Sequence, residues 1–277
     1  MDSLGNGGEV VEKRKIKWIF CALVVLFAVT AAISGYKLCT ILFEYRQGEQ
    51  ASEELRQYVV MEPEATVPAR SNKTQFPQTA TEETDPIDSQ AVFPVVDFEA
   101  LWEENADIVA WICLDGTNIN YPVVQGTDNQ YYLNHLVNGQ VSSVGSLFVD
   151  CQNQPDFSDP NTVIYGHNMK NKTMLAHITD YKKTKFFEQH ATGKIMTPTA
   201  NYRLEVIAGY VASLDEEAWR VDFADEDEVL DWLKRTMARS TIGGNYEPQP
   251  GDRVITLSTC TYDFAGARFV LVCRICE

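Results

Sequence analysis

Positive charge is scarce in this sequence. Its 277 residues include 23 lysines and arginines against 39 aspartates and glutamates, so the formal net charge is −16 at pH 7. Proteins that bind nucleic acid need clustered lysine and arginine side chains to meet the phosphates. The balance therefore argues against nucleic acid as a partner, and it suits a soluble domain in a crowded or extracellular space.

The seven cysteines lack the pattern of a structural site. A disulfide framework is not expected in a domain of this size. Cys273 and Cys276 have the C-x2-C spacing of zinc ligands, but no second cysteine or histidine cluster accompanies them. We therefore expect no metal and no cofactor.

The first long apolar run lies near the N-terminus. Four basic residues at 13–17 precede nineteen uncharged residues at 18–36, close to the ~20 that span a bilayer. This predicts a cytoplasmic basic segment at 1–17 and a transmembrane anchor at 18–36, with the bulk of the chain outside the cell. The alternative is a signal peptide cleaved near the small residues at 31–34, although the run is longer than a usual signal core.

A stalk and flexible linker are expected at 37–94. Residues 38–60 could continue as a helix, whereas 61–94 holds five prolines among many threonines, glutamates and glutamines. No internal repeats are evident. The folded domain is predicted at 95–277, and a 45% apolar content is enough for one good-sized core or two small ones.

Short apolar strands dominate the predicted domain. Asp97 can cap a first helix, and a longer helix at 225–240 has acidic residues at its start and basic residues at its end. Its predicted apolar face consists of Val229, Leu230, Leu233 and Met237. Strands are expected at 108–114, 119–124, 145–149, 162–165, 194–197, 202–212, 253–258 and 268–275. This pattern predicts a mainly β fold, a barrel or a sandwich with helical insertions.

Cys260 is the candidate nucleophile. A cysteine attacks only as a thiolate, so it needs a base or a cation nearby. Cys260 lies at the end of the apolar run VITLST, where the strand leaves the core. Any single cysteine is more often a small buried apolar residue, so the prediction depends on partners.

His167 is the candidate partner. Like Cys260, it lies just past the end of an apolar strand, and Gly166 lets the backbone turn tightly before it. A lone histidine is more often structural. The other three are expected to pack within a helix or to lie in loops and at helix ends: His177, His135 and His190.

Arg268 is the third candidate. On an apolar strand it is expensive to bury unpaired, so it either lies on an exposed face, forms a salt bridge, or donates to an oxyanion or a substrate carbonyl. Asp263 could orient the histidine, but capping the turn after Cys260 is the simpler reading.

Together these motifs resemble those of a known family. TLSTC at 256–260, the arginine that follows it and YGHNM at 165–169 resemble the signature of sortases, the membrane-anchored cysteine transpeptidases of Gram-positive bacteria. Three segments resemble class B sortases in particular: NADIVAWICLDGTNINYPVVQGTDNQYYLNH, GSLFVD and NTVIYGHNM. The helices before the first strand and before the cysteine strand resemble class B as well. The similarity extends over most of 98–275.

The resemblance implies a closed eight-stranded β-barrel and a site. His167, Cys260 and Arg268 would be the catalytic set, and Leu133 and Ser258 would lie in the wall of a peptide groove. Neither a metal nor a cofactor is implied.

The resemblance also implies an activity. Cys260 would cleave a C-terminal sorting motif of secreted proteins at a threonine carbonyl, through a thioacyl intermediate, and pass the acyl group to an amine of a cell-wall precursor or a pilin. The motif could be LPxTG-like or NPxTN-like. The alternatives are a cysteine hydrolase that uses water as acceptor and a non-catalytic adhesion or scaffold domain. The enzyme would be a single-pass membrane protein with a cytoplasmic N-terminus and an extracellular catalytic domain.

Overall fold

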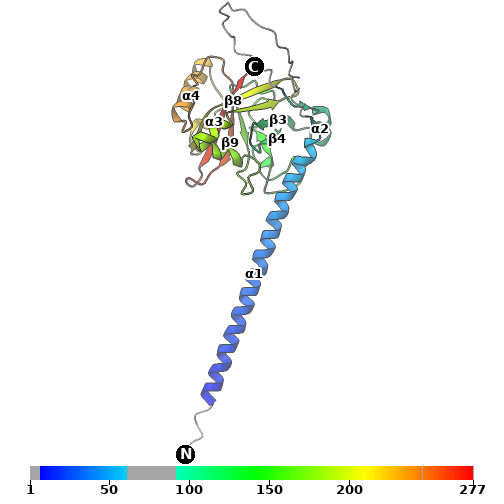
Figure 1. Ribbon diagram of the computed structural model, residues 1–277, viewed down its shortest axis with the longest axis vertical. Coiled ribbons are helices and arrows are strands. Elements are labelled where there is room, and N and C mark those ends of the chain that lie inside the picture. Colours follow the sequence, from blue (N-terminus) through cyan, green and yellow to red (C-terminus); the bar gives the residue numbers. More distant parts are fainter. Residues whose placement is uncertain (1–6, 61–91, 245, 277) are drawn as a thin grey trace, which may run out of the picture. The chain divides into compact units, whose positions relative to one another are not determined.

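The computed structural model describes residues 7–60, 92–244 and 246–276, with side chains from Trp18 onward (Figure 1). The chain forms two compact units that divide after Gln47. Most of the predicted flexible linker, residues 61–91, and the first six residues lie outside this description. The division of the chain into four segments stays a prediction.

The helix α1 (Gly7–Arg56) contains the predicted apolar run. From Trp18 it includes a stretch with a mean hydropathy of 2.3, long and apolar enough to cross a membrane. Its large apolar side chains are exposed, and Phe27 has 75% of its surface accessible. Length and composition make α1 a candidate membrane span, and a signal sequence near the N-terminus would meet the same criteria.

The second unit contains a closed barrel of eight strands in the order β10-β8-β7-β3-β4-β5-β6-β9. This confirms the predicted eight-stranded barrel and excludes the sandwich. Six strand pairs are antiparallel, whereas β4 with β5 and β6 with β9 are parallel. The strands are β3 (Ile108–Leu114), β4 (Asn120–Val124), β5 (Leu147–Val149), β6 (Asn161–Tyr165), β7 (Thr192–Met196), β8 (Asn201–Ala212), β9 (Val254–Cys260) and β10 (Arg268–Cys276).

The helix α4 (Glu226–Arg239) covers one side of this barrel (Figure 1). Asp225 caps it by accepting a hydrogen bond of 2.9 Å from the backbone N–H of Glu228. The predicted apolar face omitted Trp232, which is buried with Val229 and Leu233 against β8, β9 and β10. Positions 229, 232, 233 and 236 fall on one face of a helix with 3.6 residues per turn.

Segments before the barrel strands complete its core. The short strands β1 (Val59–Val60) and β2 (Val95–Val96) pair, and α2 (Phe98–Glu104) follows with its N-terminus capped by Asp97, as predicted. Leu55, near the end of α1, is buried in one cluster with Leu101 of α2 and Trp111 of β3. Residues 48–60 therefore pack as part of the barrel unit.

Besides α4, four short helices lie in the described connections between the barrel strands. They are η1 (Tyr131–Leu133) before β5, η2 (Ala176–Lys182) and α3 (Thr184–Gln189) between β6 and β7, and η3 (Glu217–Trp219) between β8 and α4. His177 lies in η2 as the packing residue that the sequence predicted, with its ring centroid 6.4 Å from that of Phe186. The connections that follow β6 and β8 supply four residues to a pocket at the edge of the barrel: Gly166, His167, Leu214 and Trp219.

Candidate active site

The parallel pairing of β6 and β9 brings His167 and Cys260 to the same edge of the barrel. Tyr165, the last residue of β6, is the Cα partner of Ser258 in β9. Cys260 ends β9, and His167 lies two residues beyond β6. The backbone N–H of Gly166 donates to the carbonyl of Ser258 at 3.1 Å, so the turn before His167 is fixed to the cysteine strand.

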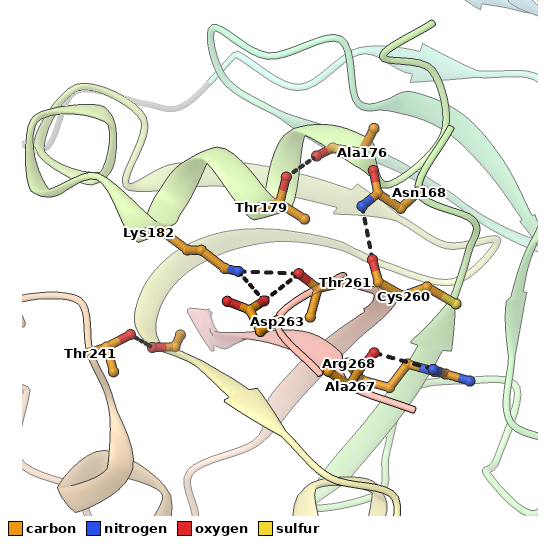
Figure 2. A network of polar contacts seen from close by, with 11 residues as sticks. Asn168, Ala176, Thr179, Lys182, Thr241, Cys260, Thr261, Asp263, Ala267 and Arg268 are labelled. Carbon is orange, nitrogen blue, oxygen red and sulfur yellow. Dashed lines mark hydrogen bonds and ion pairs between the residues drawn. The ribbon is translucent and has the colours of Figure 1, made fainter. Parts of the chain in front are cut away.

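The antiparallel pairing of β9 and β10 places Arg268 opposite Cys260. The two residues are Cα partners, and such partners stand on the same face with their Cβ atoms about 5 Å apart. Figure 2 shows the thiol and the guanidinium pointing to the same side. Nη1 of Arg268 donates to the carbonyls of Gly266 and Ala267 at 3.3 and 3.2 Å. Within the part of the chain that the structure describes, Arg268 pairs with no carboxylate.

A pocket of about 380 Å³ opens at this edge of the barrel. The five residues that the sequence predicted for the site all line it: Leu133, His167, Ser258, Cys260 and Arg268. Cys260, His167 and Arg268 are each partly buried. A volume of this size falls within the range of small-molecule binding sites.

Gly166, which the sequence predicted to turn the backbone before His167, also lines the pocket, together with six residues that were given no role: Asn129, Phe148, Tyr165, Leu214, Trp219 and Thr259. Trp219 comes from η3, and its Nε1 donates to Oγ of Ser258 at 2.8 Å. This contact joins residues 39 positions apart, and local patterns of hydrophobicity carry no signal for it.

Buried Asp150 anchors one wall of the pocket. Its Oδ2 accepts hydrogen bonds from the phenol of Tyr165 at 2.8 Å and from Nδ2 of Asn129 at 2.9 Å. Burial and the Asp150 charge raise the pKa of Tyr165, so its phenol stays protonated and keeps donating. The wall is therefore fixed before any ligand enters, which favours binding.

The ring of His167 is held by the backbone. Its Nε2 lies 2.7 Å from the carbonyl oxygen of Leu133. A carbonyl only accepts hydrogen bonds, so Nε2 carries a proton in this arrangement, and Nδ1 is the nitrogen that can gain or lose one. Asp263 does not contact this ring. Its Oδ2 accepts hydrogen bonds from Thr261 and Lys182, which fits the turn role better than the histidine-orienting one.

Three other cysteines lie in the barrel strands: Cys113, Cys273 and Cys276. Burial raises the pKa of Cys273 to about 12 and that of Cys113 to about 11, so both thiols stay protonated at neutral pH and are poor nucleophiles. Among the described residues, no three histidine, cysteine, aspartate or glutamate side chains group as metal ligands would.

Known proteins are similar to this chain in sequence and in fold. The model of the sortase domain family matches residues 112–275. The chain is 29% identical over 263 residues to sortase B of Staphylococcus aureus. This match covers 94% of this chain and 98% of that protein. It is 35% identical over 169 residues to sortase B of Listeria monocytogenes, and this match covers 60% of this chain and 69% of that protein.

A solved structure gives the same result. The substrate complex of Staphylococcus aureus sortase B is 35% identical and superposes with a TM-score of 0.62, covering 65% of this chain and 84% of that one. The barrel, its pocket and these matches define a sortase. The chain belongs to the sortase family, in its class B branch.

Proposed function

We propose that this sortase is a transpeptidase in which Cys260 is the nucleophile. The observation that carries the proposal is a single pocket lined by His167 and by the cross-strand partners Cys260 and Arg268. The thiolate of Cys260 attacks the carbonyl carbon of a threonine in the bound motif, and the carbonyl electrons move to oxygen. Arg268 stabilises that oxyanion or holds the substrate in place.

His167 moves the protons. When the tetrahedral intermediate collapses, the C–N bond breaks and the leaving amine takes a proton from the imidazolium, which leaves a thioacyl enzyme. The acceptor amine then attacks the thioester carbonyl, His167 takes its proton, and the thiolate of Cys260 departs as the new amide forms. The hydrogen bond from Nε2 to Leu133 supports Nδ1 as the nitrogen that carries this proton.

The substrates are proposed by class. The donor is a secreted protein with a C-terminal sorting motif, LPxTG-like or NPxTN-like, and the acceptor is an amine of a cell-wall precursor or a pilin lysine. The sortase B of Staphylococcus aureus has been solved as a substrate complex, which supports a substrate in the corresponding pocket here. Leu133 and Ser258 line that pocket and are proposed as substrate-binding residues.

The cellular arrangement is also proposed. The apolar stretch of α1 would anchor the chain in the membrane, with the basic segment 1–17 in the cytoplasm, a stalk and linker at 37–94 and the catalytic domain at 95–277 outside. An anchored enzyme meets an exported substrate and a lipid-linked acceptor at one surface.

The experiment compares acceptors. Full-length protein in detergent micelles is incubated with motif peptides, with and without an amine such as triglycine, and the products are identified by mass. A transpeptidase joins the peptide to the amine, a hydrolase releases the same acid in both reactions, and an adhesion domain binds without cleavage. Cys260→Ala should abolish product. Cys276→Ala, which removes another partly buried barrel cysteine, should not.

A further inference from the structure

Lys182, the last residue of η2, reaches the loop that joins β9 to β10. Its Nζ donates to Oδ2 of Asp263 at 2.5 Å and to Oγ1 of Thr261 at 3.1 Å. The Thr261 hydroxyl donates to the same Asp263 oxygen at 2.6 Å, which closes a three-membered network (Figure 2). One ammonium group thus holds both a side chain early in the loop and a carboxylate nearer its middle.

The network lies next to both reactive strand ends. Thr261 directly follows Cys260 in the chain. Nζ of Lys182 also lies 5.6 Å from the centroid of the Phe269 ring, and buried Phe269 directly follows Arg268. At 5.6 Å a cation attracts an aromatic ring. Lys182 therefore contacts both the residue that follows Cys260 and the residue that follows Arg268.

The segment that carries Lys182 also carries His167. Both lie in the connection between β6 and β7, His167 near its start and Lys182 at the end of η2. Near the start, Nδ2 of Asn168 donates to the carbonyl oxygen of Cys260 at 2.9 Å (Figure 2). The connection between β6 and β7 is thus bonded to Cys260 through Asn168, and to Thr261 and Asp263 of the following loop through Lys182.

The network does not belong to the pocket itself. The residues that line the pocket include neither Lys182 nor Asp263, so a ligand confined to the pocket would not touch them. Their side chains are 33% and 41% exposed, and an exposed ion pair contributes little to global stability. An effect of Lys182 on the reaction would therefore act through the position of the loop.

We propose that Lys182 is a positioning residue that holds the loop 261–267 against η2 and so fixes Cys260 and Arg268 relative to His167. The inference rests on the proposed transpeptidase function. Lys182→Met keeps most of the apolar stem and removes the charge and the donors. The loop should then sample more conformations, and kcat should fall by about two- to fivefold. KM should change less than kcat, because the other residues that line the pocket keep their contacts.

The control is the neighbouring lysine. Lys183 is 73% exposed and pairs with Asp180 at 3.0 Å, so Lys183→Met removes the same charge one residue away. Kinetics with a motif peptide and a saturating amine, melting temperatures and amide hydrogen exchange of residues 261–267 are measured on full-length variants. We expect faster loop exchange and lower kcat for Lys182→Met alone, and recovery with Lys182→Arg, which can still donate to the carboxylate.

A double-mutant cycle with Asp263→Asn tests the mechanism. If the two side chains act as one network, the double variant should lose no more activity than the worse single variant. The proposal is overturned if Lys182→Met matches Lys183→Met in kcat and in loop exchange, or if its loss of kcat only follows a lower melting temperature. If the unmodified chain forms no peptide product, the transpeptidase function fails, and the exchange data still decide whether Lys182 holds the loop.

Discussion

At the scale of the residue, register decides which side chains can cooperate. Arg268 meets Cys260 because both begin or end strands that pair without a shift along β9. A guanidinium on an apolar strand would be costly if buried and unpaired. Here it is partly buried, bonds two carbonyls of its own loop and lines the pocket. It can therefore donate to charge that develops on a substrate oxygen.

Arg268→Met tests that role. Removing one oxyanion donor from an active site typically lowers kcat by roughly 10²–10³-fold, and we expect a loss of that size in steady-state peptide ligation. Arg274→Met is the matched control, because Arg274 lies on the same strand and pairs with Glu205 at 2.8 Å. Equal effects of the two substitutions would contradict the role given to Arg268.

Trp219→Phe tests the pocket wall. The variant keeps an aromatic ring but loses the hydrogen bond to Ser258, which contributes about 1 kcal/mol net. We expect KM for the motif peptide to rise about fivefold with kcat nearly unchanged. Trp102→Phe loses a comparable 2.8 Å bond, to the carbonyl of Ile108, away from the pocket. A KM effect as large in that variant would argue against a specific role for Trp219.

At the scale of the element, local signals fixed the ends of α4 better than its buried face. Asp225 was predictable as a cap because a side-chain oxygen there satisfies an otherwise unpaired N–H. Trp232 was missed because the predicted apolar face was displaced around the helix toward Leu230, which is not among the buried residues of α4. The indole N–H of Trp232 donates to the Glu217 carbonyl at 2.9 Å.

Asp225→Ala should destabilise the barrel unit by about 1 kcal/mol, the usual cost of losing an N-cap. In urea unfolding we expect a lower midpoint concentration, with an unchanged dependence of the free energy of unfolding on urea. Asp231→Ala, in the middle of the same helix and exposed, removes a carboxylate without removing a cap and should have little effect. If both variants unfold at the same midpoint, the capping bond is not what stabilises α4.

His177 in η2 should make stability depend on pH. Burial is the largest influence and lowers its pKa below 6.5, with Lys172 and His190 acting in the same direction and Asp180 against them. The folded state therefore binds the proton less well than the unfolded chain. The resulting stability is present above about pH 6.5 and is lost as the pH falls through the folded pKa.

The pH effect can be isolated by substitution. His177→Gln should flatten the decline in melting temperature between about pH 7 and about pH 5. His135→Gln changes a histidine outside η2, whose ring stacks on Tyr131, and should leave the decline as it is. An unchanged profile in His177→Gln would contradict the assignment.

At the scale of the whole molecule, the sequence predicted the strands and the resemblance predicted their closure. Strand periodicity and turn residues are local, so β3 was predicted with the bounds that the structure has. Local periodicity alone left barrel and sandwich open, because closure depends on pairing between distant strands such as β6 and β9. The wall residues Asn129 and Trp219 were missed for the same reason.

The segment before the linker belongs to the barrel unit, which a truncation can test. A fragment starting at Ala91 lacks Leu55 and β1, and therefore uncovers Leu101 and Trp111. It should melt at a lower temperature than a fragment starting at Gly48, since the burial of one leucine alone contributes about 2 kcal/mol. Equal melting temperatures would show that residues 48–60 add nothing to the core.

The most direct test of the central claim is the intact mass of the protein after incubation with motif peptides and no amine. The account predicts a mass increase equal to the acyl part of one peptide, located on Cys260, absent in Cys260→Ala and removed when an amine is added. No adduct with any peptide, while a small thiol reagent still labels Cys260, would contradict the claim that this pocket performs thioacyl transfer.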